Sequence, residues 1–233
     1  MGGAEHHKDR LGSGNLSNTF ALRVGNETVA VRLCSDPYFR PWRYADTYLE
    51  GYLAAPGLPQ HEQFLANGEE YDEAALVSEL IAGTDLTHIT PENLSQVTHE
   101  QLGTFIDALI IGSQTVEHDP NPGNYMYDPY AAFKAVDYHS RTRDGVPERL
   151  EVTRLAQAIS GASIPLGYWP QTAAGRQTLR DRREASIPVL QRMIEVCEGQ
   201  FTGETSSHLT TSIEQQITLA TTYVAEYDRV HDW

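Results

Sequence analysis

The spacing of hydrophobic residues changes at about residue 82, from a pattern typical of strands to a pattern typical of helices. Before that point, the β-favouring runs "FALRVG" and "ETVAVRL" are joined by a Gly25-Asn26 turn, and "QHEQFLA" and "AALVSELI" predict two more strands. After "AGTDL", apolar residues recur every three or four positions over long segments. This order predicts an α+β protein, in which a small antiparallel sheet precedes a mostly helical part.

The helical pattern predicts five helices, at residues 44–57, 90–116, 147–160, 173–199 and 210–230. The second begins with the helix-start signal Thr90-Pro91-Glu92. The last carries an apolar stripe that predicts core packing, formed by Ile213, Ile217, Ala220, Val224 and Tyr227. In the fourth, Arg176, Arg180 and Arg183 recur at helical spacing and predict an exposed, salt-bridged face.

The composition is that of a folded globular protein, with 40% hydrophobic and 21% charged residues. No run reaches about 18 apolar residues, and the first ten residues lack the apolar stretch of a secretory signal. Cys34 and Cys197 match no metal-ligand spacing and are expected to be reduced. These features predict a cytoplasmic protein without a membrane partner.

The formal net charge of −15 repels the phosphates of nucleic acids and anionic membrane surfaces. The same charge attracts cations, so it favours a cationic small molecule over a polyanion as a binding partner. An alternative is that the charge serves only solubility.

A protein that binds a nucleoside triphosphate needs main-chain amides and a cation near the phosphates. Two groups of residues could supply them. Gly12, Ser13 and Gly14 lie in "LGSGNLSNT", an expected loop where glycine allows a phosphate to approach the backbone. Arg32 is a cation between apolar neighbours on an expected strand. An ordinary turn and a surface arginine would give the same patterns.

A third group could bind magnesium and orient an acceptor hydroxyl. Asp119 and Asn124 lie five positions apart in the loop "EHDPNPGNYMYD", and Asp137 follows the β-like run "FKAV". Carboxylate and amide oxygens are ligands that Mg²⁺ accepts. Each residue alone is equally compatible with surface polarity, but the three follow in order behind a glycine-rich hairpin and an expected hinge at "SELIAG".

In this order, "LGSGNLSNTFALRV", "VAVRL", "ALVSELIAGTDL", "HDPNPGNYMYD" and "AVDYH" resemble the motifs of the protein-kinase-like fold, most closely its aminoglycoside phosphotransferase and small-molecule kinase family. The resemblance covers about residues 10–140. It implies a bilobal protein, with a nucleotide-binding N-terminal lobe over residues 1–81 and a helical C-terminal lobe over residues 82–233 that carries the catalytic and metal loops. It also implies ATP and Mg²⁺ as cofactors and a small molecule with an acceptor hydroxyl as substrate; the acidic charge favours a cationic one, such as an aminoglycoside.

The resemblance implies a role for each matching residue. Asp119 would be the catalytic aspartate that orients the acceptor hydroxyl and takes its proton, while Asn124 and Asp137 would bind magnesium. Gly12 and Gly14, with Ser13 between them, would cover the phosphates.

Further roles follow for the N-terminal lobe. Arg32 stands where the family has lysine, and Asp46 would pair with it, with Glu50 as the rival. The main chain from Glu79 to Ile81 would meet the adenine edge.

The sequence departs from the family in two respects besides Arg32. Glu117 stands two positions before Asp119, where the family has histidine, and no long activation segment follows Asp137. The second departure disfavours a protein kinase. Two alternatives stay open: a pseudokinase that acts as a nucleotide-binding or protein-interaction module, and a helical protein with an accessory sheet.

Overall fold

The structure is a computed structural model of the 233-residue chain. It describes residues 9–13, 17–24, 27–34, 61–64, 74–81, 83–113, 116–118, 121–130, 132–136, 138–141, 148–161 and 172–231. The chain divides into two compact units, Met1–Ile81 and Ala82–Trp233. The protein is α+β, with small antiparallel sheets and long helices.

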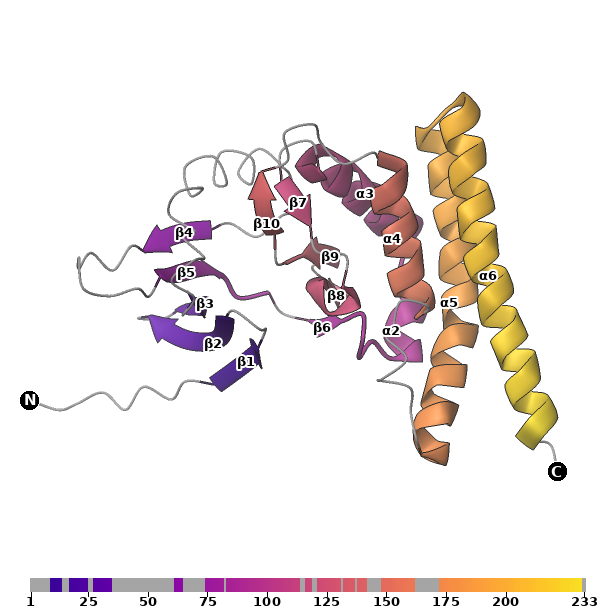
Figure 1. The fold of residues 1–233 in the computed structure, drawn as a ribbon, viewed down its shortest axis with the longest axis horizontal. Coiled ribbons are helices and arrows are strands. Elements are labelled where there is room, and N and C mark those ends of the chain that lie inside the picture. Colours follow the sequence, from indigo (N-terminus) through magenta and orange to yellow (C-terminus); the bar gives the residue numbers. More distant parts are fainter. Residues whose placement is uncertain are drawn as a thin grey trace, which may run out of the picture. The chain divides into compact units, whose positions relative to one another are not determined.

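The first unit contains a five-stranded antiparallel sheet with the strand order β1-β2-β3-β5-β4 (Figure 1). Its strands are β1 (Asp9–Ser13), β2 (Ser17–Val24), β3 (Glu27–Cys34), β4 (His61–Phe64) and β5 (Ala74–Glu79). The last pair of β2 and β3 is Val24 with Glu27, so the two strands form the expected tight hairpin. The four predicted strands are confirmed. The helix predicted at residues 44–57 lies outside the described residues.

The loop predicted at "LGSGNLSNT" is wrong for its first three residues, which belong to β1, and for its last three, which belong to β2. Gly12 pairs with Thr19 and Ser13 with Asn18 on β2. The register shifts between Arg10 and Gly12, as at a β-bulge. Glycine and serine have low strand propensity, but pairing with a neighbouring strand overrides it because the main-chain groups gain hydrogen-bond partners.

The described residues of the second unit form two small sheets and five helices. The strands form the orders β6-β8-β9 and β10-β7 and are all antiparallel to their neighbours. The strands are β6 (Thr84–Asp85), β7 (Val116–His118), β8 (Tyr125–Asp128), β9 (Ala132–Ala135) and β10 (Tyr138–Arg141), and the 3₁₀ turn η2 spans Pro122–Asn124. The helices are α2 (Pro91–Ser95), α3 (His99–Ser113), α4 (Glu148–Ser160), α5 (Ala173–Gln200) and α6 (Gly203–His231).

Helices α5 and α6 lie side by side and form a long hairpin, and α5 also packs on α2, α3 and α4 (Figure 1). The largest fully buried side chains come from strand β8, from the turn after β6 and from each of the five described helices: Leu86, Leu94, Leu102, Ile106, Leu109, Tyr125, Tyr127, Leu155, Ile159, Leu190, Met193 and Leu209. In the predicted stripe of the last helix, Ile213 and Ala220 are fully buried. Among the described residues, no helix is long and apolar enough to cross a membrane.

The buried thiol of Cys197 belongs to this core. Burial raises its pKa to about 12, so the thiol stays protonated at neutral pH. The expectation of a reduced, buried cysteine is confirmed at this position.

The single helix predicted over residues 90–116 is wrong, because two helices, α2 and α3, occupy this segment. The first is capped by Thr90 as predicted. A second cap follows at Thr98, whose hydroxyl accepts a hydrogen bond from the Gln101 amide at 3.2 Å while the Gln101 side chain accepts one from the Thr98 amide at 3.0 Å. This reciprocal capping box starts a new helix at His99.

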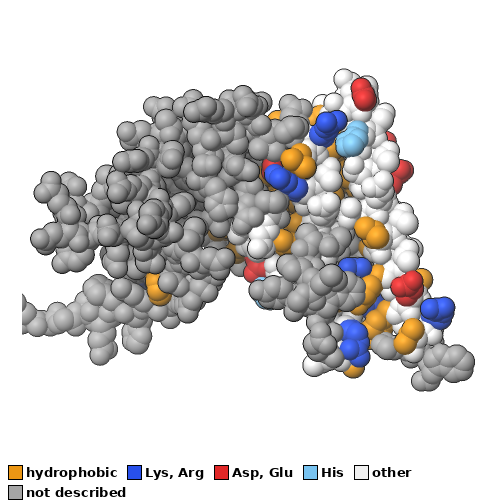
Figure 2. Space-filling model, in the orientation of Figure 1, with side chains coloured by type: hydrophobic (Ala, Val, Ile, Leu, Met, Phe, Trp, Pro, Cys, Tyr) orange, Lys and Arg blue, Asp and Glu red, His pale blue; other side chains and the backbone are white. Residues whose placement is uncertain are grey.

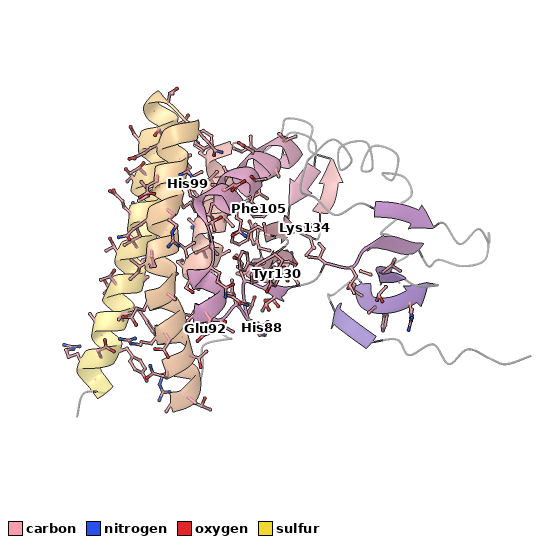
Figure 3. All side chains as sticks on the ribbon, turned by 180° about the vertical axis from the view of Figure 1, so that it is seen from behind. His88, Glu92, His99, Phe105, Tyr130 and Lys134 are labelled. Atoms are coloured by element: carbon pink, nitrogen blue, oxygen red, sulfur yellow. The ribbon has the colours of Figure 1, made fainter. Side chains whose placement is uncertain are left out.

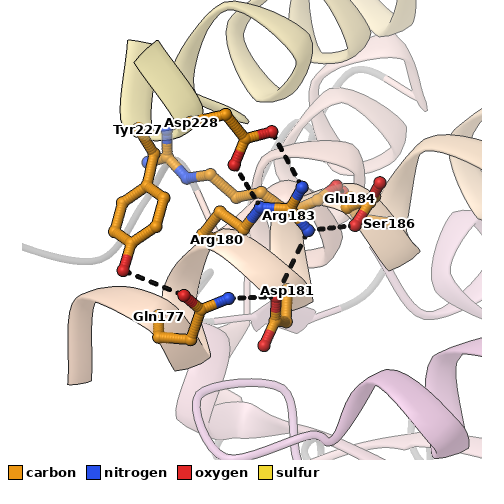
Figure 4. A network of polar contacts seen from close by, with 8 residues as sticks. All are labelled: Gln177, Arg180, Asp181, Arg183, Glu184, Ser186, Tyr227 and Asp228. Atoms are coloured by element: carbon orange, nitrogen blue, oxygen red, sulfur yellow. Dashed lines mark hydrogen bonds and ion pairs between the residues drawn. The ribbon is translucent and has the colours of Figure 1, made fainter. Parts of the chain in front are cut away.

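Polar contacts join the first half of α5 to the end of α6 (Figure 4). The Arg180 guanidinium donates two hydrogen bonds of 2.9 Å to the Asp228 carboxylate and also pairs with Glu184. These bonds raise the pKa of Arg180 and lower the pKa of Asp228. The Tyr227 hydroxyl donates to Gln177 at 2.9 Å. The predicted salt-bridged face is confirmed at Arg180.

The same prediction is wrong for Arg183, which is buried. Its guanidinium carbon lies 4.3 Å from the centroid of the Tyr223 ring. Burial lowers the pKa of Arg183. The cation–π attraction of the Tyr223 ring compensates in part for the hydration that the guanidinium loses.

Candidate active site

The sheet of the first unit brings two predicted phosphate-contact residues into one cross-strand row. Gly12 on β1 pairs with Thr19 on β2, and Thr19 pairs with Arg32 on β3. The row continues to Leu76 on β5. Because neighbouring strands are about 4.8 Å apart, the backbones of Gly12 and Arg32 lie about 10 Å apart across the sheet.

The remaining predicted residues of this unit lie at its edge or outside the described part. Glu79 is the last residue of β5 and Ile81 follows it two positions later, half-buried. Gly14, Asp46 and Glu50 lie outside the described residues.

In the second unit, two strand pairings connect the segments that carry the predicted catalytic and metal residues. Tyr138 on β10 pairs with His118 on β7. The main-chain oxygen of Asn124 accepts a hydrogen bond of 2.8 Å from the Val136 amide, which extends the hairpin of β8 and β9 by one step. Asp119 and Asp137 themselves lie outside the described residues.

Residues Asn121–Asn124, here named the Asn124 turn, have a local structure that follows from the sequence Asn-Pro-Gly-Asn. The Asn121 side chain accepts a hydrogen bond from the Gly123 amide at 3.0 Å, and the Asn121 carbonyl accepts one from the Asn124 amide at 2.8 Å. Pro122 begins the 3₁₀ turn, where its missing N–H needs no partner, and it is buried. The turn holds Asn124, whose side chain is half-buried, at the start of β8.

A second turn, here named the Asp85 turn, covers residues Asp85–His88. The Asp85 carboxylate accepts hydrogen bonds from the amides of Thr87 at 2.8 Å and His88 at 3.1 Å, and it also bonds the His88 ring nitrogen Nδ1. The Leu86 amide donates to the Tyr125 carbonyl at 2.8 Å, so this turn lies directly against the Asn124 turn.

The Asp85 turn was not predicted, although the sequence carries a signal for it. An aspartate with main-chain amides two and three positions later can form an Asx turn, and Thr-Asp follows a glycine here. The structure also shows why Gly83 precedes it. Its φ of +124° suits glycine, and a Cβ there would lie 2.5 Å from the Tyr127 carbonyl oxygen.

An aromatic cluster supports the strands next to the Asn124 turn. Phe105 of α3 lies against these strands (Figure 3), with its ring stacked on Phe133 at 5.2 Å between centroids and edge-on to Tyr125 at 6.3 Å. The Tyr127 hydroxyl donates to the Gln101 side chain at 3.2 Å, and burial raises the pKa of this tyrosine. The cluster fixes the hairpin by packing that involves no predicted catalytic side chain.

Figure 2 shows acidic and basic side chains interspersed along the drawn face of α5 and α6. Among the described residues there is no group of three or more His, Cys, Asp or Glu placed to hold a metal ion.

No known protein-family model matches the sequence, and no curated protein matches it at a significant level. The resemblance to small-molecule kinases therefore rests on the motifs quoted above. The roles of the individual residues stay predictions.

Proposed function

We propose that this protein is an ATP- and Mg²⁺-dependent phosphotransferase that phosphorylates a hydroxyl group of a small molecule. In this proposal the two units are the lobes of a protein-kinase-like fold. The observation that carries it is the main-chain pairing in the second unit: His118 pairs with Tyr138, and the Val136 amide donates a hydrogen bond to the Asn124 carbonyl. These four residues include one predicted magnesium ligand and the sequence neighbours of Asp119 and Asp137.

The sheet of the first unit gives independent support. The segment that covers the phosphates and the cation that binds them must act on one nucleotide, so we expect both on the same sheet. Gly12 and Arg32 share one cross-strand row, and Arg32 lies on the third strand. Protein kinases also carry their phosphate-contacting cation on the third strand.

The predicted magnesium ligands fit the metal in their chemistry. Asn124 offers an amide oxygen and Asp137 a carboxylate, and Mg²⁺ prefers such oxygen donors while keeping several waters. When bound, Mg²⁺ would neutralise the negative charge of the β- and γ-phosphates. The Asn124 turn fits this role because hydrogen bonds of the Asn124 main-chain amide and carbonyl fix the position of its backbone.

The remaining roles belong to side chains of the chain itself. Asp119 would orient the acceptor hydroxyl and accept its proton, so the hydroxyl oxygen can attack the γ-phosphorus in line with the departing ADP. Arg32 would place a cation at the phosphate oxygens. A guanidinium prefers bidentate contacts, so Arg32 would bind two phosphate oxygens where lysine binds as a point charge.

The test is an assay of ADP release with ATP, Mg²⁺ and a panel of hydroxyl acceptors: an aminoglycoside, choline and a neutral sugar. We expect acceptor-dependent turnover with an amine-bearing compound, because the net charge of −15 favours cations. Asp119→Asn should lower kcat by about 10²- to 10⁴-fold, the usual contribution of a general base. The matched control Asp107→Asn changes an exposed aspartate of α3 and should retain full turnover.

Two results would contradict the proposal. Equal ADP release by the wild type and Asp119→Asn would remove the catalytic role of Asp119. Binding of ATP without turnover of any acceptor would favour the pseudokinase module, in which the protein keeps a nucleotide site but has lost the chemistry.

A further inference from the structure

Arg182 on α5 is a buried cation with an unusual set of partners. Only 4% of its surface is exposed. Its two terminal nitrogens donate to main-chain carbonyls, Nη1 to Thr87 at 3.3 Å and Nη2 to Ala158 at 3.0 Å. Its Nε is buried, and none of the described residues accepts a hydrogen bond from it. No carboxylate in the described chain forms an ion pair with it, unlike Arg180 two residues earlier.

Burial of the Arg182 guanidinium is energetically unfavourable. A buried arginine at this position therefore indicates a role for its hydrogen bonds that apolar packing would not fill. Burial lowers the pKa of Arg182 to about 10, and the attraction of Asp85 opposes this effect only in part. The guanidinium is still charged at neutral pH. Burying a charge without an ion-pair partner lowers the stability of the folded protein, whereas an apolar side chain of similar volume fills such a site without that penalty.

The two carbonyls that Arg182 contacts belong to elements that pack on the Asn124 turn. Thr87 lies in the Asp85 turn, whose Leu86 amide bonds the carbonyl of Tyr125, the residue after Asn124. A Cβ on Gly123 would lie 3.7 Å from the Thr87 hydroxyl. Ala158 lies on α4, which contacts the 3₁₀ turn η2.

We propose that Arg182 is a positioning residue, which fixes the Asn124 turn by holding the Asp85 turn and α4 against α5. One guanidinium binds both carbonyls at once, which a lysine ammonium or an apolar side chain cannot do in the same geometry. The effect on the Asn124 turn is independent of the phosphotransferase proposal. Only its consequence for catalysis rests on that proposed function.

The test is amide hydrogen exchange of the full chain, measured by NMR for wild type, Arg182→Met and Arg182→Lys. The reporters are the amides of Asn124 and Val136, which form the main-chain bonds of the turn. We expect Arg182→Met to speed their exchange about tenfold or more relative to amides in the middle of α6, since a charge-assisted hydrogen bond contributes about that factor. Arg182→Lys should restore part of the protection.

Arg192→Met is the matched control. Arg192 also lies on α5 and also donates to a main-chain carbonyl, that of Val97 at 3.0 Å, but Val97 links α2 to α3. If both variants speed exchange at Asn124 and Val136 equally, or if neither does, Arg182 contributes only to global stability and the proposal is wrong. Should Arg182→Met fail to fold, Arg182→Lys compared with Arg192→Lys decides the question by the same two reporters.

The catalytic consequence is measured separately. If the wild type turns over an acceptor, Arg182→Lys should lower kcat and raise the Mg²⁺ concentration needed for half-maximal turnover, because the turn presents Asn124, a predicted magnesium ligand. If the wild type shows no turnover, the proposed function is wrong. The hydrogen-exchange experiment still tests the positioning role of Arg182, because it does not depend on turnover.

Discussion

The Asn124 turn and the α5–α6 hairpin belong to one compact unit but are held by different kinds of interaction. The turn is fixed by main-chain hydrogen bonds, from Leu86 to Tyr125 and from Val136 to Asn124, both 2.8 Å long. The helical hairpin is held by buried apolar side chains and by side-chain contacts such as Arg180 with Asp228.

This difference matters because a main-chain hydrogen bond survives most substitutions of its own side chain. The Asn124 turn can therefore carry functional side chains whose replacement changes chemistry more than stability. In the helical hairpin the side chains themselves supply the stability, so substitutions there should act on unfolding. The following predictions test this division.

The largest effect is expected for Leu190→Ala in the helical hairpin. Leu190 is fully buried, so the substitution removes apolar contacts and leaves a cavity, which should lower the free energy of unfolding by about 2–5 kcal/mol. Urea denaturation measures this. Leu219→Ala is the matched control because Leu219 of α6 is 52% exposed, and it should change stability by less than about 0.5 kcal/mol.

A smaller effect is expected for Gly83→Ala, next to the Asp85 turn. The positive φ and the contact of a new Cβ with the Tyr127 carbonyl should lower the free energy of unfolding by about 1–3 kcal/mol. Near the Asp85 turn, the effect on unfolding would therefore come from the backbone conformation of Gly83 and not from a buried side chain. A neutral Gly83→Ala in the same denaturation experiment would show that the backbone near the turn is not fixed as described.

Thr98→Ala should cost about 1 kcal/mol, the typical contribution of an N-cap side chain. The substitution removes the hydroxyl that accepts a hydrogen bond from the Gln101 amide. Thermal unfolding of Thr98→Ala and of Thr222→Ala, an exposed threonine within α6, makes the comparison. Thr222→Ala should be neutral or stabilising since alanine favours helix; equal losses in both variants would mean that the cap contributes nothing.

The smallest effect is expected for Asp228→Asn, and it should depend on pH. The bond from Arg180 lowers the pKa of the Asp228 carboxyl in the folded protein, so its contribution is present above the ordinary carboxyl pKa of about 4 and is lost as pH falls through the lowered folded value. Unfolding curves of the wild type and Asp228→Asn should differ at pH 7 and converge in acid. Glu226→Gln, an exposed neighbour, should follow the wild type throughout, and a constant gap at all pH values for Asp228→Asn would contradict the ion pair.

The sequence predicted those elements whose signals are local. The hairpin at Val24–Glu27 and the cap at Thr90 follow from nearby turn and cap residues, and both are present. The break at Thr98 had an equally local signal, but a continuous apolar period on both sides outweighed it in the interpretation.

Other features depended on tertiary contacts that spacing does not encode. Gly12 and Ser13 form a strand only because β2 lies beside them. Arg182 and Arg183 resemble exposed helical arginines in sequence, and their burial is set by α4 and α6. The predicted site is described in part, at Gly12, Ser13, Arg32, Glu79, Ile81 and Asn124, so the roles of Asp119 and Asp137 stay predictions.

The most direct test of the central claim is calorimetric titration of the protein with ATP, with and without Mg²⁺, beside the variants Asp137→Ala and Asn124→Ala. We predict Mg²⁺-dependent binding that both variants weaken strongly, while their urea denaturation curves stay close to that of the wild type. Absence of ATP binding under every condition, or Mg²⁺-dependent binding that both variants keep unchanged, would contradict the assignment of these residues to a nucleotide and metal site.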